Sequence, residues 1–246
     1  MTRPLCLALS LLLASGSVAS TPPAAEPTQP KKPPVIVIGF VGGFVKHDNA
    51  VHSEVQLADR LRQDYPSGVQ VQVFENHRRE KAHEEILRSL DTNNDGSLSA
   101  EEKQQAHIII YGHSWGASET VTLARELEKD GIPVLLTIQV DSISKSRQND
   151  MLIPANVSQA ANFYQPDGFL RGRSEIRPAN AARTQIIGNF RFDYKTLPIS
   201  CPLYPWFDRF FMKSHVEIEC DPRVWNQVES LIRAKLPSSS GTVSAR

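Results

Sequence analysis

The chain has no excess of charge of either sign, because 27 lysine and arginine residues balance 27 aspartate and glutamate residues. Nucleic-acid-binding domains usually carry a basic face, so this balance gives no support for a nucleic-acid partner. Cysteine is scarce, with three residues in 246. The hydrophobic content of 40% is nevertheless enough for one α/β domain with a buried core.

The N-terminal apolar run, residues 5–13, is too short to cross a membrane as a helix, which takes about 20 residues. Arg3 precedes this run, and the small residues Ser17, Val18 and Ala19 follow it. This pattern is typical of a signal peptide, here residues 1–19. We therefore expect a secreted or periplasmic protein without a transmembrane anchor after signal cleavage.

Composition divides the rest of the chain into a linker, a folded domain and a tail. We expect residues 20–34, rich in proline, alanine, threonine and lysine, to form a linker, and residues 237–246 to form a flexible tail. The domain between them spans residues 35–236. Removal of the leader leaves Cys201 and Cys220, which would form a disulfide in an oxidising compartment or stay as two buried thiols; we favour the disulfide.

Apolar runs and helical spacings alternate along the domain. The expected strands cover residues 35–40, 69–74, 107–111, 134–140 and 184–188, with a weaker one near 161–164. The expected helices cover residues 51–61, 79–90, 117–129 and 222–236. This order predicts an α/β fold, a mostly parallel sheet flanked by helices in a single domain. Ligands bind such sheets beyond the carboxyl ends of the strands.

Residues 112–116 read Gly-His-Ser-Trp-Gly, between the expected strand 107–111 and the expected helix 117–129. A serine hydroxyl becomes a useful nucleophile when a sharp strand-to-helix turn exposes it beside a base, and such a turn needs small neighbours. Gly112 and Gly116 supply them. The alternative is a tight turn without chemistry. We favour Ser114 as a nucleophile.

This stretch, together with the glycines after the first strand and a histidine late in the chain, resembles the α/β-hydrolase superfamily of lipase-like and esterase-like serine hydrolases. The resemblance covers roughly residues 35–236. It implies a parallel sheet, a Ser–acid–His triad and an oxyanion hole made of backbone amides. Of the seven histidines, His215 alone fits the late position of the catalytic base. A surface-loop histidine is the alternative for His215. We expect His113 to point away from the serine and to pack.

The resemblance also implies an acid that orients the histidine, and superfamily members differ over which strand carries it. Asp141 ends the strand 134–140 and is our first choice; Asp167, in Gln-Pro-Asp-Gly, is the alternative. The amide of Trp115 should form one half of the oxyanion hole. The amide of Phe40 or Val41, which precede two glycines, should form the other half.

Aromatic residues are frequent between 192 and 212, before His215. This segment could line an acyl pocket or form a lid, or its rings could simply pack on the core.

A second motif lies at residues 91–102, which match the EF-hand loop D-x-N-x-D-G-x5-E. Its expected calcium ligands are Asp91, Asn93, Asp95, the carbonyl of Ser97, Ser99 through water and bidentate Glu102. The alternative is a solvated acidic turn. Because the loop precedes the strand that leads to Ser114, it should lie at the opposite end of the sheet. We therefore expect a structural Ca²⁺.

Together these patterns predict a secreted serine hydrolase that cleaves carboxylic esters of small molecules or lipids through Ser114, His215 and Asp141. Thioesterase or amidase activity is an alternative, since the same nucleophile serves all acyl transfers. A second alternative is a calcium-stabilised binding module on a hydrolase scaffold that has lost turnover.

Overall fold

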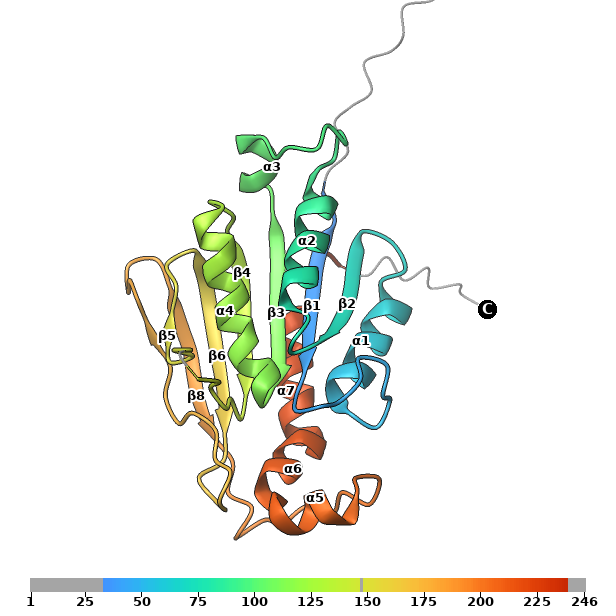
Figure 1. Ribbon diagram of the computed structural model, residues 1–246, viewed down its shortest axis with the longest axis vertical. Helices are drawn as coiled ribbons and strands as arrows, with labels where there is room; N and C mark the ends of the chain where they lie inside the picture. Colours follow the sequence, from blue (N-terminus) through green and yellow to red (C-terminus); the bar gives the residue numbers. More distant parts are fainter. Residues whose placement is uncertain (1–32, 147, 239–246) are drawn as a thin grey trace, which may run out of the picture. The chain divides into compact units, whose positions relative to one another are not determined.

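The computed structural model describes residues 33–146 and 148–238, and its centre is a six-stranded sheet in the order β2-β1-β3-β4-β6-β8 (Figure 1). All neighbouring strands pair in parallel, which confirms the α/β fold class. The strands are β1 (Val35–Val41), β2 (Val69–Glu75), β3 (His107–His113), β4 (Val134–Val140), β6 (Val157–Tyr164) and β8 (Gln185–Arg191), with a separate pair β5 (Leu152–Ile153) and β7 (Arg177–Pro178). The expected signal peptide lies outside the described residues.

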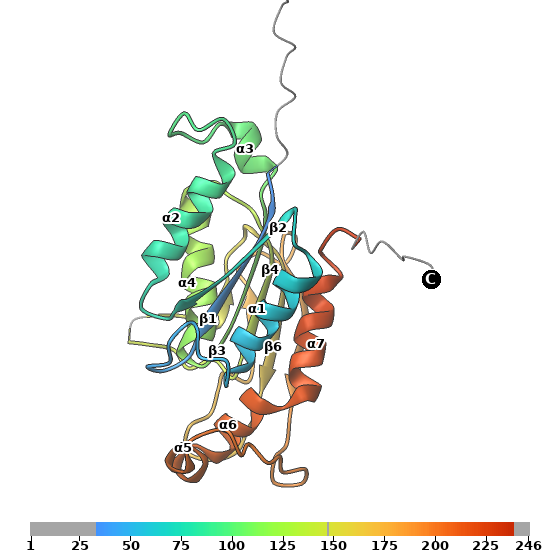
Figure 2. The same cartoon turned by 90° about the vertical axis from the view of Figure 1, so that its right-hand side faces the viewer.

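Helices cover both faces of the sheet (Figure 2). They are α1 (Ser53–Asp64), α2 (Arg79–Leu90), α3 (Ala100–Gln104), α4 (Trp115–Lys129), α5 (Trp206–Phe211), α6 (Lys213–Cys220) and α7 (Pro222–Arg233). Side chains alternate between the faces of a strand. Val37 on β1 thus joins the core beneath α1 and α7, whereas Ile38 joins the core beneath α2 and α4.

The strand order puts β1, β3 and β4 next to one another at the centre, where every residue of β1 is buried. Burial on both faces explains the apolar runs of β1 and of residues 108–111 in β3. It also brings the carboxyl ends of these three strands together at one edge of the sheet. The EF-hand-like segment and α3 lie at the other edge (Figure 1). The seven residues of β3 separate the two edges by about 20 Å.

Strand β6 is longer than expected. It spans eight residues, whereas the sequence predicted a strand of four, 161–164. Its first half contains polar side chains that break the apolar pattern. Asn162, also polar, is fully buried because its amide donates to the Arg173 carbonyl and to the Asn189 side chain. Hydrogen bonds through its amide nitrogen thus allow this polar residue to lie among the buried apolar residues of the strand. At the other end of the domain, α7 ends at Arg233, three residues before the expected end at 236.

Two helices, α5 and α6, were not predicted from the sequence. Both are short, at six and eight residues, and a change of backbone direction at Met212 (φ −123°, ψ 34°) separates them. Helices of this length show too few turns for an apolar period to be recognised. His215 therefore lies on a buried helix and not on a surface loop. Among the described residues, the helices are all too short or too polar to span a membrane.

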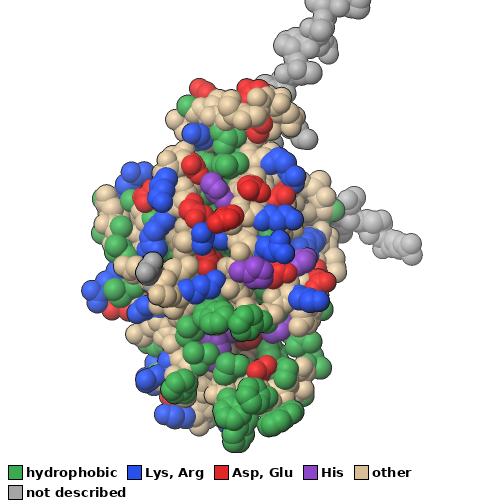
Figure 3. Space-filling model, in the orientation of Figure 1, with side chains coloured by type: hydrophobic (Ala, Val, Ile, Leu, Met, Phe, Trp, Pro, Cys, Tyr) green, Lys and Arg blue, Asp and Glu red, His purple; other side chains and the backbone are tan. Residues whose placement is uncertain are grey.

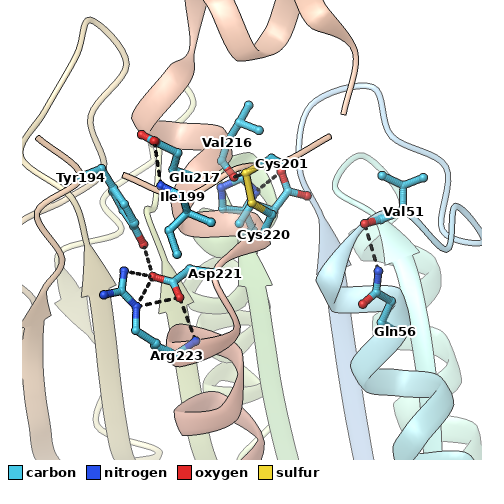
Figure 4. The surroundings of a disulfide bond; sticks show 12 residues. Val51, Gln56, Tyr194, Ile199, Cys201, Val216, Glu217, Cys220, Asp221 and Arg223 are labelled. Atoms are coloured by element: carbon cyan, nitrogen blue, oxygen red, sulfur yellow. Dashed lines mark hydrogen bonds and ion pairs between the residues drawn. A yellow bond between two sulfur atoms is a disulfide. The ribbon is translucent and has the colours of Figure 1, made fainter. Parts of the chain in front are cut away.

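Cys201 and Cys220 form a disulfide with their Cα atoms 6.0 Å apart (Figure 4). The bond ties the segment before α5 to the last residue of α6. Directly after it, Asp221 caps α7 and accepts a hydrogen bond from Tyr194 at 2.9 Å. The carboxyl-terminal end of α6 is therefore held on two sides.

Removing this disulfide should destabilise the domain by about 3 kcal/mol, the chain-entropy value for a loop of this length. The test compares the double variant Cys201→Ser, Cys220→Ser with the wild type. The thermal melting of both proteins is measured with and without reductant. The reduced wild type should melt at the temperature of the double variant. A wild type whose melting is insensitive to reductant, with two thiols open to alkylation in its native state, would contradict this prediction.

Candidate active site

Ser114 lies at the junction of β3 and α4 with a positive φ of 57° and a ψ of −125°. This conformation is strained for a residue other than glycine and costs about 1–3 kcal/mol. Its glycine neighbours permit it. A Cβ atom on Gly112 would lie 2.7 Å from the Gly116 backbone, and one on Gly116 would lie 2.3 Å from the Phe40 carbonyl oxygen. The turn therefore depends on bare backbone at both positions.

Three side chains from different elements form a continuous chain of hydrogen bonds. Ser114 Oγ lies 2.9 Å from His215 Nε2, and His215 Nδ1 lies 2.6 Å from Asp141 Oδ2. The carboxylate can only accept, so Nδ1 carries the proton and Nε2 is free to accept the serine proton. The side chains of all three residues are largely buried, with at most 7% of each residue exposed.

Asp141, directly after β4, is held independently of His215. The Gly172 amide donates to its Oδ1 at 2.9 Å, and the Gln165 side-chain amide donates to its Oδ2 at 2.9 Å. A Cβ atom on Gly172 would lie 2.3 Å from Asp141 Oδ1, so the close approach of residue 172 to the carboxylate requires glycine. These donors compensate the burial of the charge. They also fix the direction in which the carboxylate faces His215.

Asp167, the alternative acid, does not contact His215. Its carboxylate forms a salt bridge with Lys195 at 3.0 Å. The structure therefore brings Asp141, and not Asp167, to the histidine.

The candidate oxyanion residues surround the serine. Trp115 is the first residue of α4, where backbone N–H groups have no partner within the helix. Phe40 and Val41 end β1, and their carbonyl oxygens pack against Gly116. Gly42 follows them, and a Cβ atom there would lie 2.9 Å from the Ser114 Cβ. The segment after β1 thus borders the serine closely.

His113 is buried as expected, but it packs against the site instead of pointing away from it. Its ring centroid lies 4.5 Å from that of His215. Burial lowers the pKa of His113 to about 4, so the ring is neutral at pH 7. On its other side His113 faces two buried carboxylates, Glu54 and Glu219.

Those carboxylates belong to a cluster that the sequence did not reveal. His52, Glu54 and Glu219 offer ligand atoms within 4.8 Å of one another and could hold a metal ion. A local signal existed for one member, since Glu219 follows His215 by four residues and so shares its helix face. No such signal links α6 to residues 52–54, which lie more than 160 positions earlier.

The aromatic segment divides into buried and exposed rings. Tyr194 and Tyr204 are buried, and Phe192 packs on the core. The rings of α5 face outward: Trp206, Phe207, Phe210 and Phe211 are 53–73% exposed. Hydrophobic side chains accordingly gather at the end of the molecule that carries α5 and α6 (Figure 3).

The EF-hand-like loop is curled by positive φ angles at Asn94 (58°) and Gly96 (82°). Asp91 accepts hydrogen bonds from the Asp95 and Gly96 amides. Glu102 accepts from Thr92 near the start of the loop and from Ser99, with which it forms a capping box for α3. Among the described residues, the loop carboxylates do not converge to within 4.8 Å, as the His52 group does.

Other residues of the loop are also hydrogen-bonded within it. Asn93 donates to the Asp95 carboxylate at 2.9 Å, and Ser97 donates to the same carboxylate at 2.8 Å. These bonds keep the side chains on the inner side of the loop.

No protein-family model matches the sequence, and no curated protein sequence matches it. Solved structures resemble it loosely. The RedJ thioesterase of the prodiginine pathway in Streptomyces coelicolor is 11% identical, with 88% of this chain and 96% of that chain covered and a TM-score of 0.42. A cutinase-like protein from Cryptococcus sp. is 11% identical (82% and 95% covered, TM-score 0.41). Human thioesterase 2 is 10% identical (84% and 98% covered, TM-score 0.41).

Asp141→Asn should lower kcat for ester hydrolysis by about 10⁴-fold, because the amide would stabilise the wrong histidine tautomer. Asp167→Asn is the matched control and should leave kcat nearly unchanged, since Asp167 pairs with Lys195. Steady-state kinetics on both variants would measure this. A larger loss in Asp167→Asn than in Asp141→Asn would refute the assignment of the acid.

Proposed function

We propose that the protein is a serine hydrolase that cleaves carboxylic esters through an acyl-enzyme on Ser114. The observation that carries this proposal is the hydrogen-bonded chain from Ser114 through His215 to Asp141. His215 takes the serine proton as Ser114 attacks the carbonyl carbon, and it returns the proton to the leaving alcohol. Water then attacks the acyl-enzyme with the same base, releasing the acid and restoring the serine.

The transition-state oxyanion needs donors that are already in place. The Trp115 amide, at the positive end of the α4 dipole, is one such donor. An amide of the segment after β1, Phe40 or Val41, is the second in this proposal. The strained backbone of Ser114, together with the hydrogen bond between its hydroxyl and His215, supports turnover over a silent binding scaffold.

The exposed aromatic surface of α5 supports a substrate with an apolar acyl group, from a small-molecule ester or a lipid. The Phe207 and Phe211 rings pack against each other in a tilted arrangement, with 4.5 Å between their centroids, and α5 directly precedes the helix that carries His215. Exposed apolar area of this kind marks a surface that binds something. A thioester with the same acyl group is the second substrate class, because it meets the same nucleophile.

Ser114→Ala should abolish turnover and leave the melting temperature nearly unchanged. An alkyl phosphonate should add one adduct to the wild type and to Ser89→Ala, a matched serine variant on α2, but none to Ser114→Ala. Intact mass spectrometry and p-nitrophenyl ester kinetics measure both effects. A panel of acyl lengths, compared with acyl-thioesters, defines the substrate class. Wild-type turnover in Ser114→Ala would show that the nucleophile is wrong.

We also propose that residues 91–102 bind a structural Ca²⁺ and that the protein is secreted. All the donors of the loop are oxygens, as Ca²⁺ prefers. Glu102 already turns back toward the second residue of the loop, and the positive φ of Gly96 supplies the sharp turn. The paired cysteines are consistent with an oxidising compartment.

Calcium at a hundredfold excess over its Kd should stabilise the fold by about 2.7 kcal/mol, a rise in melting temperature of roughly 5–10 °C. The metal-stripped wild type and Glu101→Gln, the exposed neighbouring control, should respond to added CaCl₂. Glu102→Gln should not. Because the loop lies at the far edge of the sheet, kcat at low temperature should stay constant. If added calcium does not change the melting temperature of the wild type, the loop is an acidic turn that binds no calcium, and the proposal is wrong.

A further inference from the structure

The cluster of His52, Glu54 and Glu219 lies beneath the triad and plays no part in the hydrolysis described above. Glu219 is on α6, one turn after His215. His52 is the N-cap residue of α1, and Glu54 is in its first turn. The His52 Nδ1 atom is hydrogen-bonded to Glu219. The cluster therefore joins the first helix of the domain to the helix that carries the base.

Glu54 is the anomaly in this cluster. It is fully buried, and neither of its carboxylate oxygens has a hydrogen-bond partner among the described residues. A buried carboxylate without compensation costs several kcal/mol. Within the part of the chain that the structure describes, the basic side chains within 4 Å of the Glu54 and Glu219 carboxylates are histidines, His52 and His113. Two buried carboxylates thus face each other without a lysine or an arginine.

His113 lies beside this three-residue group and offers a further nitrogen close to both carboxylates. Its Nδ1 lies 3.4 Å from Glu219 Oε2 and 3.9 Å from Glu54 Oε1. In a tetrahedral site with bonds of 2.0–2.1 Å, neighbouring ligand atoms are about 3.3–3.4 Å apart. The His113–Glu219 distance has this value already, whereas the His52–Glu219 contact would lengthen as the ion replaces the shared proton.

We propose that His52, Glu54, Glu219 and His113 bind one zinc-class divalent cation behind the catalytic triad. Imidazole nitrogens combined with carboxylate oxygens suit Zn²⁺ in tetrahedral geometry, whereas Ca²⁺ takes oxygen ligands alone. The ion neutralises the two carboxylates and supplies the partner that Glu54 lacks. It touches no atom of Ser114, so its role is structural: it fixes α6, and with it His215, against α1.

The surroundings already hold these ligands in place. The Tyr111 hydroxyl donates to the Glu54 carbonyl at 2.8 Å, and the Tyr204 ring packs edge-on against His52 at 5.3 Å. The disulfide at Cys220 fixes the residue after Glu219. Ligands on constrained backbone lose little entropy when an ion binds. The proposal does not depend on Ser114 acting as a nucleophile.

The test is metal binding to the full secreted chain, freed of tags and stripped of metal, with ZnCl₂ and CoCl₂ as the probes. We expect one Zn²⁺ per chain by elemental analysis and visible d–d absorption of bound Co²⁺ at tetrahedral intensity. Glu54→Gln and Glu219→Gln should each weaken Zn²⁺ binding by at least about tenfold. Glu217→Gln, a buried control on the same helix, and Glu102→Gln, in the calcium loop, should bind as the wild type does.

Melting temperatures keep the test decisive if a variant is less stable. Zn²⁺ should raise the melting temperature of the wild type and of Glu217→Gln, but not that of Glu54→Gln. The proposal is overturned if the wild type binds no Zn²⁺, or if Glu54→Gln and Glu219→Gln bind it with unchanged affinity. Because none of these measurements uses turnover, a failed metal site and a failed hydrolase assignment give different results.

Discussion

The contact between the first turn of α4 and the end of β1 is the constraint on which the active end of the molecule depends. The Phe40 carbonyl occupies the place of a side chain at Gly116, so the helix can start there only on bare backbone. The chain must then turn within one residue, which puts Ser114 at φ 57°. Its N–H donates to the Val140 carbonyl, and its own carbonyl accepts from the Ile143 amide. The serine is therefore locked between β1, β4 and α4, and the helix packing compensates the strain.

The base reaches this serine from α6, a short buried helix that packs Ile218 into the core and is also positioned by polar and covalent contacts. The disulfide and the cap at Asp221 hold its end, and Asp141 holds His215 from the sheet. Glu219 connects the same helix to α1 through His52. These attachments act from three directions, and each is polar or covalent. A helix of eight residues is unstable alone, so its order follows from these attachments.

The features that were best predicted from the sequence are those that depend on neighbouring residues in the chain. Buried central strands such as β1 and β3 appear as continuous apolar runs, and the elbow appears as two glycines around Ser114. Asn162 shows why β6 was understated, because its burial depends on Arg173 and Asn189, partners 11 and 27 positions away. The contact between His52 and Glu219 spans 167 positions and leaves no periodic trace. Side-chain clusters assembled by the fold escape any argument from spacing.

The two proposed cation sites differ in a way that follows from their ligands. The loop at the amino edge of the sheet offers oxygens on an exposed turn, which suits a large, hard ion with many ligands. The cluster at the carboxyl edge offers imidazoles and carboxylates in a dry core, which suits a small ion with four ligands. Exchange of the first ion alters the stability of the loop. Loss of the second removes the shared partner of Glu54 and Glu219. Both of these residues face the His113 ring, which packs against His215, so the effect extends to the surroundings of the triad.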